Sequence, residues 1–209
     1  MKAPALILSN LAIGYADGGS KRQIVDNIDV RLYSGELVSL VGLNGAGKST
    51  LLRTISAFQL PLSGGIEYCG CDLRISDASQ LSRRLAIVLT GREPVYNLSV
   101  REVVAMGRMP YTGFFGLNSE RDRRVVDEAM QMLGILALAD RMIDTLSDGE
   151  RQKAMIAKAV AQETPIILLD DVMSELDASR RDYLLNHLSG KQVSVPCCET
   201  AYFKTLENG

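Results

Sequence analysis

Apolar and polar residues alternate along the first part of the chain in the way that β-strands require. Residues 6–13 and 24–32 carry this pattern, and the segment 17–20 between them is rich in glycine. Side chains of a strand point alternately to the two faces of a sheet, and glycine permits the tight turn between paired strands. The pattern therefore predicts an antiparallel pair, with residues 63–68 as a further hairpin strand.

The apolar spacing becomes helical between about residue 98 and residue 161. Ser99 precedes Glu102 by three positions, and Ser119 opens a second segment in which apolar residues recur every three or four positions. A serine with an acid three residues later is typical of a helix N-terminus. We expect a helical subdomain over residues 91–150, inserted into an α/β core formed by residues 1–90 and 151–209.

Residues 42–50 lie between an apolar strand, residues 37–41, and a predicted helix. They fit the phosphate-loop pattern Gly-x-x-x-x-Gly-Lys-[Ser/Thr], in which backbone N–H groups and a helix N-terminus bind a polyphosphate. Lys48 is expected to contact the β- and γ-phosphates, and Ser49 to offer a hydroxyl to Mg²⁺. The predicted ATP-binding residues of this loop are Gly42, Asn44, Gly45, Ala46, Gly47, Lys48, Ser49 and Thr50.

A continuous apolar run, residues 164–169, ends at two carboxylates, Asp170 and Asp171. Such runs are typical of strands inside a parallel sheet, and the carboxyl ends of these strands are where α/β sheets bind ligands. Phosphoryl transfer needs a carboxylate near Mg²⁺ and a group beside the attacking water. We therefore expect Asp170 in the metal site and Asp171, with Asp170 and Lys48, in catalysis, whereas a solvated turn is the alternative.

Two aromatic stretches leave alternatives open. Tyr15 precedes the glycine-rich turn, where it is either an ordinary strand-end residue or a ring that stacks on the nucleotide base. Residues 109–116 form an apolar, aromatic loop punctuated by glycine. This loop is either buried packing or an exposed surface that binds a partner.

The composition of the chain mainly excludes kinds of partner and site. The chain has 209 residues, of which 46% are hydrophobic and 23% charged, as in ordinary globular proteins. Its net charge of −2 gives no basic surface for binding nucleic acid. No apolar run approaches the roughly 20 residues of a membrane span. The cysteines, paired as Cys69-x-Cys71 and Cys197-Cys198, lack zinc-site spacing. We expect a cytoplasmic protein whose membrane association, if any, is peripheral.

Residues 146–152 read Leu-Ser-Asp-Gly-Glu-Arg-Gln. This segment resembles the LSGGQ signature of ABC ATPases, and its position between the phosphate loop and the acidic strand is specific for that class. The resemblance implies a P-loop NTPase fold with an antiparallel β edge and a homodimer that binds two ATP molecules. Each ATP then lies between the phosphate loop of one subunit and Ser147, Gly149 and Glu150 of the other, with Asp177 in the adjacent D-loop.

Residues 1 to about 164 look most similar to the ATP-binding subunits of iron–siderophore, haem and cobalamin importers. The resemblance rests on Gly14-Tyr15, the phosphate loop, residues 108–113 and the LSDGE form of the signature. It implies an ATPase at the inner face of the cell membrane, whose helical subdomain binds membrane permease subunits. Thr90 stands where such subunits carry a Mg²⁺-sensing glutamine, so it joins Ser49 and Asp170 as a metal-site residue.

Residues 165–209 resemble instead the C-terminus of the RecF family of DNA-repair ATPases, which are themselves ABC-type ATPases. Asp171 takes the place of a catalytic glutamate, the switch histidine is absent, and Pro196 argues against a central strand at residues 192–198. We also expect the chain to end before the closing strand and helices of either family. The alternatives to an importer subunit are thus a DNA-repair ATPase or a hybrid that binds ATP and hydrolyses it poorly. Acidic residues outnumber basic residues in this segment, which argues against a nucleic-acid partner.

Overall fold

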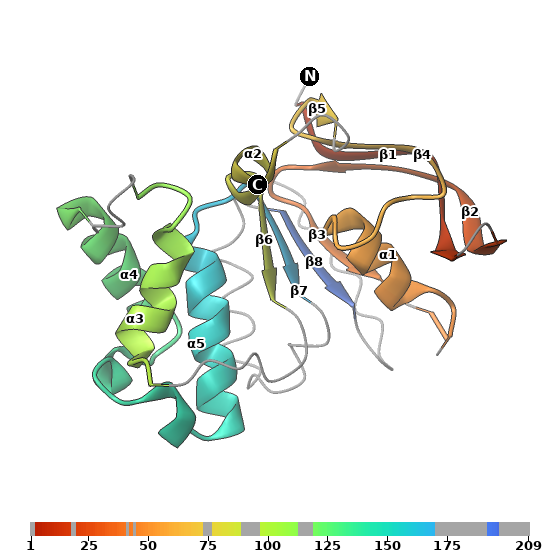
Figure 1. The fold of residues 1–209 in the computed structure, drawn as a ribbon. Coiled ribbons are helices and arrows are strands. Elements are labelled where there is room, and N and C mark those ends of the chain that lie inside the picture. Colours follow the sequence, from red (N-terminus) through yellow and green to blue (C-terminus); the bar gives the residue numbers. More distant parts are fainter. Residues whose placement is uncertain are drawn as a thin grey trace, which may run out of the picture.

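The computed structural model describes residues 3–17, 20–40, 42–43, 45–72, 77–88, 97–112, 119–169 and 192–196. Within these residues the strands form two four-stranded sheets. Figure 1 shows helices α3, α4 and α5 on one side of the parallel sheet, and the antiparallel sheet with α1 on the other side.

The antiparallel sheet has the strand order β2-β1-β4-β5. The predicted hairpin is confirmed, because β1 and β2 pair antiparallel from Asp17 opposite Ser20 to Pro4 opposite Tyr33. Both strands are longer than the sequence pattern indicated, and the third predicted strand, β4, pairs with the other edge of β1. The bounds are β1 (Pro4–Asp17), β2 (Ser20–Tyr33), β4 (Ser63–Tyr68) and β5 (Cys71–Asp72).

The second sheet is parallel, with the order β3-β8-β7-β6. Strand β7 is buried along its whole length, as its continuous apolar sequence predicts. The bounds are β3 (Leu37–Leu40), β6 (Leu85–Val88), β7 (Ile166–Leu169) and β8 (Gln192–Pro196).

Pro196 argued against a central strand at residues 192–198, and this prediction is wrong. Strand β8 pairs with β3 on one edge and with β7 on the other. The proline is tolerated because it is the last residue of the strand, where it lies opposite Leu40 of β3, whereas the ladder to β7 ends two residues earlier, at Ser194. A missing N–H at a strand end interrupts no continuing ladder.

Alternate residues of β7 face two different hydrophobic clusters. Ile167 and Leu169 pack with α3, α4 and α5. Ile166 and Leu168 pack with β1, β4 and Ile55 of α1. The two-residue period of a strand thus places the parallel sheet between a helical layer and a layer formed by α1 and the antiparallel sheet.

The helical region begins where the serine-based patterns predict. Ser99, Ser119 and Ser147 each cap a helix and form a reciprocal capping box with the acid three residues later. Among the described residues, no helix combines the length and apolar content needed to cross a bilayer. The bounds are α1 (Lys48–Ile55), α2 (Ala78–Ser82), α3 (Val100–Ala105), α4 (Glu120–Met132) and α5 (Asp148–Ala161), with 3₁₀ turns η2 (Met106–Arg108), η3 (Leu136–Leu138) and η4 (Ile143–Thr145).

Candidate functional site

The glycine loop turns sharply into α1 through backbone conformations that favour glycine. Gly45 and Gly47 have φ angles of +84° and +91°. A Cβ atom on Gly47, the residue that caps α1, would lie 2.8 Å from Cγ2 of Ile24, whereas one on Gly45 would meet nothing within 4 Å. Gly47 is therefore fixed both by its φ angle and by the close approach of β2.

Lys48, the first residue of α1, extends back over this loop. Its Nζ donates hydrogen bonds to the carbonyl oxygens of Gly42 and Leu43, the latter at 3.0 Å. The loop is closed from within by a hydrogen bond of 3.1 Å from the N–H of Ala46 to the Leu43 carbonyl. An ammonium held against a glycine loop, beside the N-terminus of a helix, is suited to binding phosphate oxygens.

The first turn of α1 carries two hydroxyl residues, one exposed and one buried. Ser49 is exposed, whereas Thr50 is 5% exposed and its hydroxyl lies 3.2 Å from that of Tyr15. Tyr15, which is 45% exposed, is thereby brought from the end of β1 to the phosphate loop. The amide of Gln59 also donates to the carbonyl oxygen of Gly14, which fixes the strand end next to Tyr15.

The predicted signature segment forms the exposed N-terminus of α5. The backbone N–H and the hydroxyl of Ser147 both donate to one carboxylate oxygen of Glu150, at 3.0 and 2.8 Å. These hydrogen bonds, first that of the side chain and then that of the backbone, lower the pKa of Glu150 below its usual range. A Cβ atom on Gly149 would meet nothing within 4 Å, so the described chain leaves open space at this position.

The phosphate loop and the signature segment do not meet within one copy of the chain. Helix α1 packs on the face of the parallel sheet that carries Ile166 and Leu168, and α5 packs on the opposite face. Figure 1 shows the two helices on the two sides of that sheet. Among the predicted ATP contacts, one chain therefore brings together Tyr15 and the loop, and leaves Ser147, Gly149 and Glu150 apart from them.

Five predicted site residues lie outside the described residues: Asn44, Thr90, Asp170, Asp171 and Asp177. Their assigned roles remain predictions. Asp170 directly follows Leu169, the last residue of the buried strand β7.

The residues that the structure describes are compatible with Mg²⁺ bound together with a nucleotide. Within them, no cluster of three or more His, Cys, Asp or Glu side chains is arranged as a metal site. Mg²⁺ commonly takes one or two protein ligands and completes its shell with phosphate oxygens and water. The exposed Ser49 hydroxyl beside the loop is one donor of the kind that such an ion accepts, and the role of Asp170 remains a prediction.

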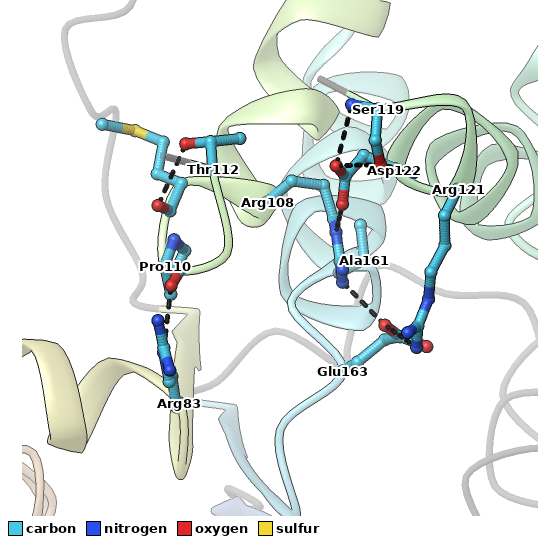
Figure 2. A network of polar contacts seen from close by, with 10 residues as sticks. Arg83, Arg108, Pro110, Thr112, Ser119, Arg121, Asp122, Ala161 and Glu163 are labelled. Atoms are coloured by element: carbon cyan, nitrogen blue, oxygen red, sulfur yellow. Dashed lines mark hydrogen bonds and ion pairs between the residues drawn. The ribbon is translucent and has the colours of Figure 1, made fainter. Parts of the chain in front are cut away.

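Sequence reasoning missed a buried ionic network around Arg108, which is 2% exposed. Its guanidinium donates to Asp122 at 2.8 Å, to the carbonyl oxygen of Ala161 at 2.7 Å and to Glu163 at 2.8 Å (Figure 2). Hydrogen bonds from Ser119 and, to a smaller extent, from Arg108 lower the pKa of Asp122 to about 2. The acid in the Ser119 capping pattern was the only signal in the sequence, and nothing local indicated its arginine partner.

This network positions the exposed loop that follows η2. The Arg108 guanidinium lies 4.3 Å from the centre of the Tyr111 ring. Arg83 donates to the carbonyl oxygen of Pro110 at 3.0 Å (Figure 2). Met109 is 63% and Tyr111 37% exposed. Of the two alternatives for residues 109–116, the described residues 109–112 thus favour an exposed surface, and residues 113–118 lie outside the described ranges.

Comparison with known proteins assigns residues 25–174 to the ABC transporter family. The ferric enterobactin transport ATP-binding protein of Escherichia coli K12 is 37% identical over 179 residues, which cover 86% of this chain and 65% of that protein. The cobalamin import ATP-binding protein of Halobacterium salinarum is 39% identical over 159 residues, which cover 76% of this chain and 39% of that protein. The chain thus spans less than two thirds of the length of these relatives.

A solved structure shows the same fold in a dimer. A dimeric ATP-binding cassette in a post-hydrolysis state, bound to ADP and phosphate, superposes with a TM-score of 0.76 at 25% identity, covering 91% of this chain and 87% of its own. The relatives named above are transport proteins and give no support to the DNA-repair alternative. The chain belongs to the ABC transporter family and has the P-loop NTPase fold of the ABC ATPase domain.

Proposed function

We propose that this protein binds ATP with Mg²⁺ and hydrolyses it to drive the import of an iron chelate, haem or cobalamin through a membrane permease. The observation that carries the proposal is the geometry of the phosphate loop. Gly45 and Gly47 turn the chain into α1 with positive φ angles, and Lys48, the first residue of α1, extends back over the loop. The names of the relatives, a ferric enterobactin transporter and a cobalamin importer, support the class of cargo.

Binding of the triphosphate would use groups that the loop already orients. The N-terminus of α1 and the Lys48 ammonium both contribute positive charge at this loop, and positive charge favours an anion. Phosphate oxygens would replace the carbonyl oxygens of Gly42 and Leu43 as partners of Lys48. We assign the Tyr15 ring, which is hydrogen-bonded to Thr50, to stacking on the base.

For hydrolysis we assign Asp171 to orient and deprotonate the attacking water, and Asp170 and Ser49 to hold the metal ion. When bound, Mg²⁺ would neutralise charge on the β- and γ-phosphates. Both acids directly follow β7 in the sequence, and β7 is buried along its whole length. Thr90 follows β6, the neighbour of β7, and we keep it as a further group near the metal.

The active unit that we propose is a homodimer with two ATP molecules. Because α1 and α5 lie on opposite faces of the parallel sheet, Ser147 and Gly149 cannot face the loop of their own chain. A second copy would supply them, as the resemblance to ABC ATPases implies, and Asp177 would lie at the same interface. The dimeric arrangement of the cassette bound to ADP and phosphate supports this.

We propose further that residues 91–150 bind the permease at the inner face of the membrane. The exposed side chains of Met109 and Tyr111, on a loop held by Arg83 and Arg108, give an apolar surface for this contact. Exposed apolar side chains rimmed by charge are characteristic of protein interaction sites.

The test is nucleotide binding by a lysine variant and a matched control. Titration calorimetry with MgATP should show binding to the purified protein, and Lys48→Ala should weaken it about 100-fold, since a charge-assisted phosphate contact is lost. Lys21→Ala, which removes an exposed lysine of β2, should leave the affinity unchanged. Equal affinities of the Lys48 variant and the parent protein would contradict the proposal.

A further inference from the structure

The N-terminus of α5 is closed by a carboxylate of its own chain. One oxygen of Glu150 accepts hydrogen bonds from both the backbone N–H and the hydroxyl of Ser147. In return, the N–H of Glu150 donates to the Ser147 hydroxyl oxygen at 3.4 Å. A serine hydroxyl has one proton, and this proton is already donated.

This closure matters because of what the same atoms are expected to bind. The proposed dimer requires the Ser147 hydroxyl and the N-terminal turn of α5 to receive the triphosphate of the partner copy. The positive end of a helix attracts a carboxylate and a phosphate for the same reason, so both compete for one place. The Glu150 carboxylate occupies that place in the single chain.

The charge of this turn increases the competition. Asp148 and Glu150 are both in the first turn of α5. The LSGGQ signature that this segment resembles has uncharged residues at these two positions. Arg141 and Lys153 lower the pKa of Glu150 only as minor contributors after the Ser147 hydrogen bonds, so the carboxylate is ionised at neutral pH.

The other two capping boxes of the protein show that the geometry alone is ordinary. Ser99 and Glu102 make the same hydrogen bonds at the start of α3. Ser119 and Asp122 do so at the start of α4, where the carboxylate is also bonded to Arg108. The α5 box differs in its sequence context, because it lies in the signature segment.

We propose that the charge of Glu150, held beside Ser147 at the N-terminus of α5, repels the partner's triphosphate and thereby weakens the ATP-dependent pairing of two copies. This inference rests on the proposed dimeric function. Glu150 holds Ser147 in place for the single chain and weakens the closed dimer by its charge.

The experiment compares Glu150→Gln with Glu102→Gln. Glutamine also serves in a capping box, so both variants keep their helix cap and lose only the charge. Dimer formation is measured by sedimentation velocity over a range of protein concentrations, with saturating Mg²⁺ and the non-hydrolysable analogue AMP-PNP. Thermal denaturation without nucleotide reports on the fold.

Glu150→Gln should lower the dimer dissociation constant about tenfold, because it removes the repulsion between a carboxylate and a triphosphate at each of two sites. The difference should shrink in 0.5 M NaCl, since salt screens it. Glu102→Gln should dimerise as the parent protein does, and both variants should melt at similar temperatures.

Two results would overturn the inference while leaving the dimeric function intact. One is equal dimerisation of the parent protein and Glu150→Gln; the other is weaker dimerisation of the variant, which would make Glu150 a favourable contact. If neither protein associates at any concentration while both bind the analogue, the proposed dimer itself fails, and the inference with it.

Discussion

The hydroxyl groups of Tyr15 and Thr50 lie 3.2 Å apart and join the end of β1 to the first turn of α1. The two residues are 35 positions apart in the sequence, and Thr50 is part of the phosphate loop motif. The hydrogen bond holds an exposed ring beside the loop. It therefore connects the proposed base-binding residue directly to the proposed phosphate-binding helix.

This arrangement predicts different effects of two substitutions at Tyr15. Tyr15→Phe keeps the ring and loses only the hydrogen bond to Thr50, so ATP affinity should fall by about fivefold or less, in line with a net value near 1 kcal/mol. Tyr15→Ala also removes the stacking surface, worth about 1–3 kcal/mol per base, and should weaken binding by roughly 10- to 100-fold. Calorimetric titration with ATP checks both values.

A triphosphate without a base serves as the control for this prediction. Inorganic triphosphate should bind the parent protein and Tyr15→Ala equally well. If Tyr15→Ala weakened triphosphate and ATP by the same factor, the ring would be acting on the loop rather than on the base.

Substitution of two loop glycines should show that the loop requires glycine at one position and tolerates alanine at the other. Gly47→Ala places a Cβ atom 2.8 Å from Ile24 Cγ2 and 3.2 Å from Val25 Cγ2, at a φ angle of +91°. We expect a loss of about 1–3 kcal/mol in the free energy of unfolding, from the strained φ angle and the displaced strand. Urea denaturation measures this loss.

Gly42→Ala is the matched comparison. Its Cβ atom would lie 3.6 Å from that of Ala46, an ordinary contact. Stability should change by less than about 1 kcal/mol, as is usual for a substitution without a clash. A larger loss for Gly42→Ala than for Gly47→Ala would contradict the loop geometry.

The serine caps of α3 and α5 predict equal stability effects and unequal effects on hydrolysis. Ser99→Ala and Ser147→Ala each remove a helix cap, which should cost about 1 kcal/mol. Only Ser147 is expected to contact the γ-phosphate of the partner, and loss of one transition-state donor typically slows a reaction about 100-fold or more. Steady-state phosphate release by each variant measures the rate. Similar rates for the two variants would remove Ser147 from the active site.

The buried Arg108–Asp122 pair predicts a specific dependence of stability on pH. Asp122→Asn removes one of the two carboxylates that pair with Arg108 and leaves Glu163 in place, so it should lower the free energy of unfolding by about 1–3 kcal/mol at pH 7. The pKa of Asp122 is lowered from 3.8 to about 2. Its ionic contribution is therefore complete above about pH 4 and is lost as the pH falls through 2; after discounting for solvent screening it amounts to about 1–2 kcal/mol.

Urea denaturation of the parent protein and Asp122→Asn between pH 7 and pH 2 tests this sign. The difference between the two should shrink as the pH falls below 4. Asp127→Asn, on the same helix, breaks the exposed pair with Arg101 and should cost less than about 1 kcal/mol at any pH. A difference for Asp122→Asn that grew toward low pH would contradict the proposed ionic role.

Local sequence patterns predicted the elements whose signals lie within a few residues. The alternation in residues 6–13 and 24–32 predicted β1 and β2, and Ser99 and Ser119 marked the starts of α3 and α4. The same logic failed at Pro196, because the position of β8 between β3 and β7 depends on pairing with segments far away in the chain. Proline weakens a strand locally, and it says nothing about where the strand ends relative to each neighbour.

The sequence alone predicted the residues of the proposed site: a phosphate loop that contains Lys48, a capped signature helix that begins after Ser147, and an apolar strand that leads to Asp170. These are short-range patterns, since hydrogen bonds of caps and turns join residues three or four positions apart. Only the tertiary structure decided that Tyr15 reaches Thr50, that Arg108 binds Asp122 and Glu163, and that α1 and α5 lie on opposite faces of one sheet. Such contacts depend on how distant segments share a buried core, and no local pattern records that packing.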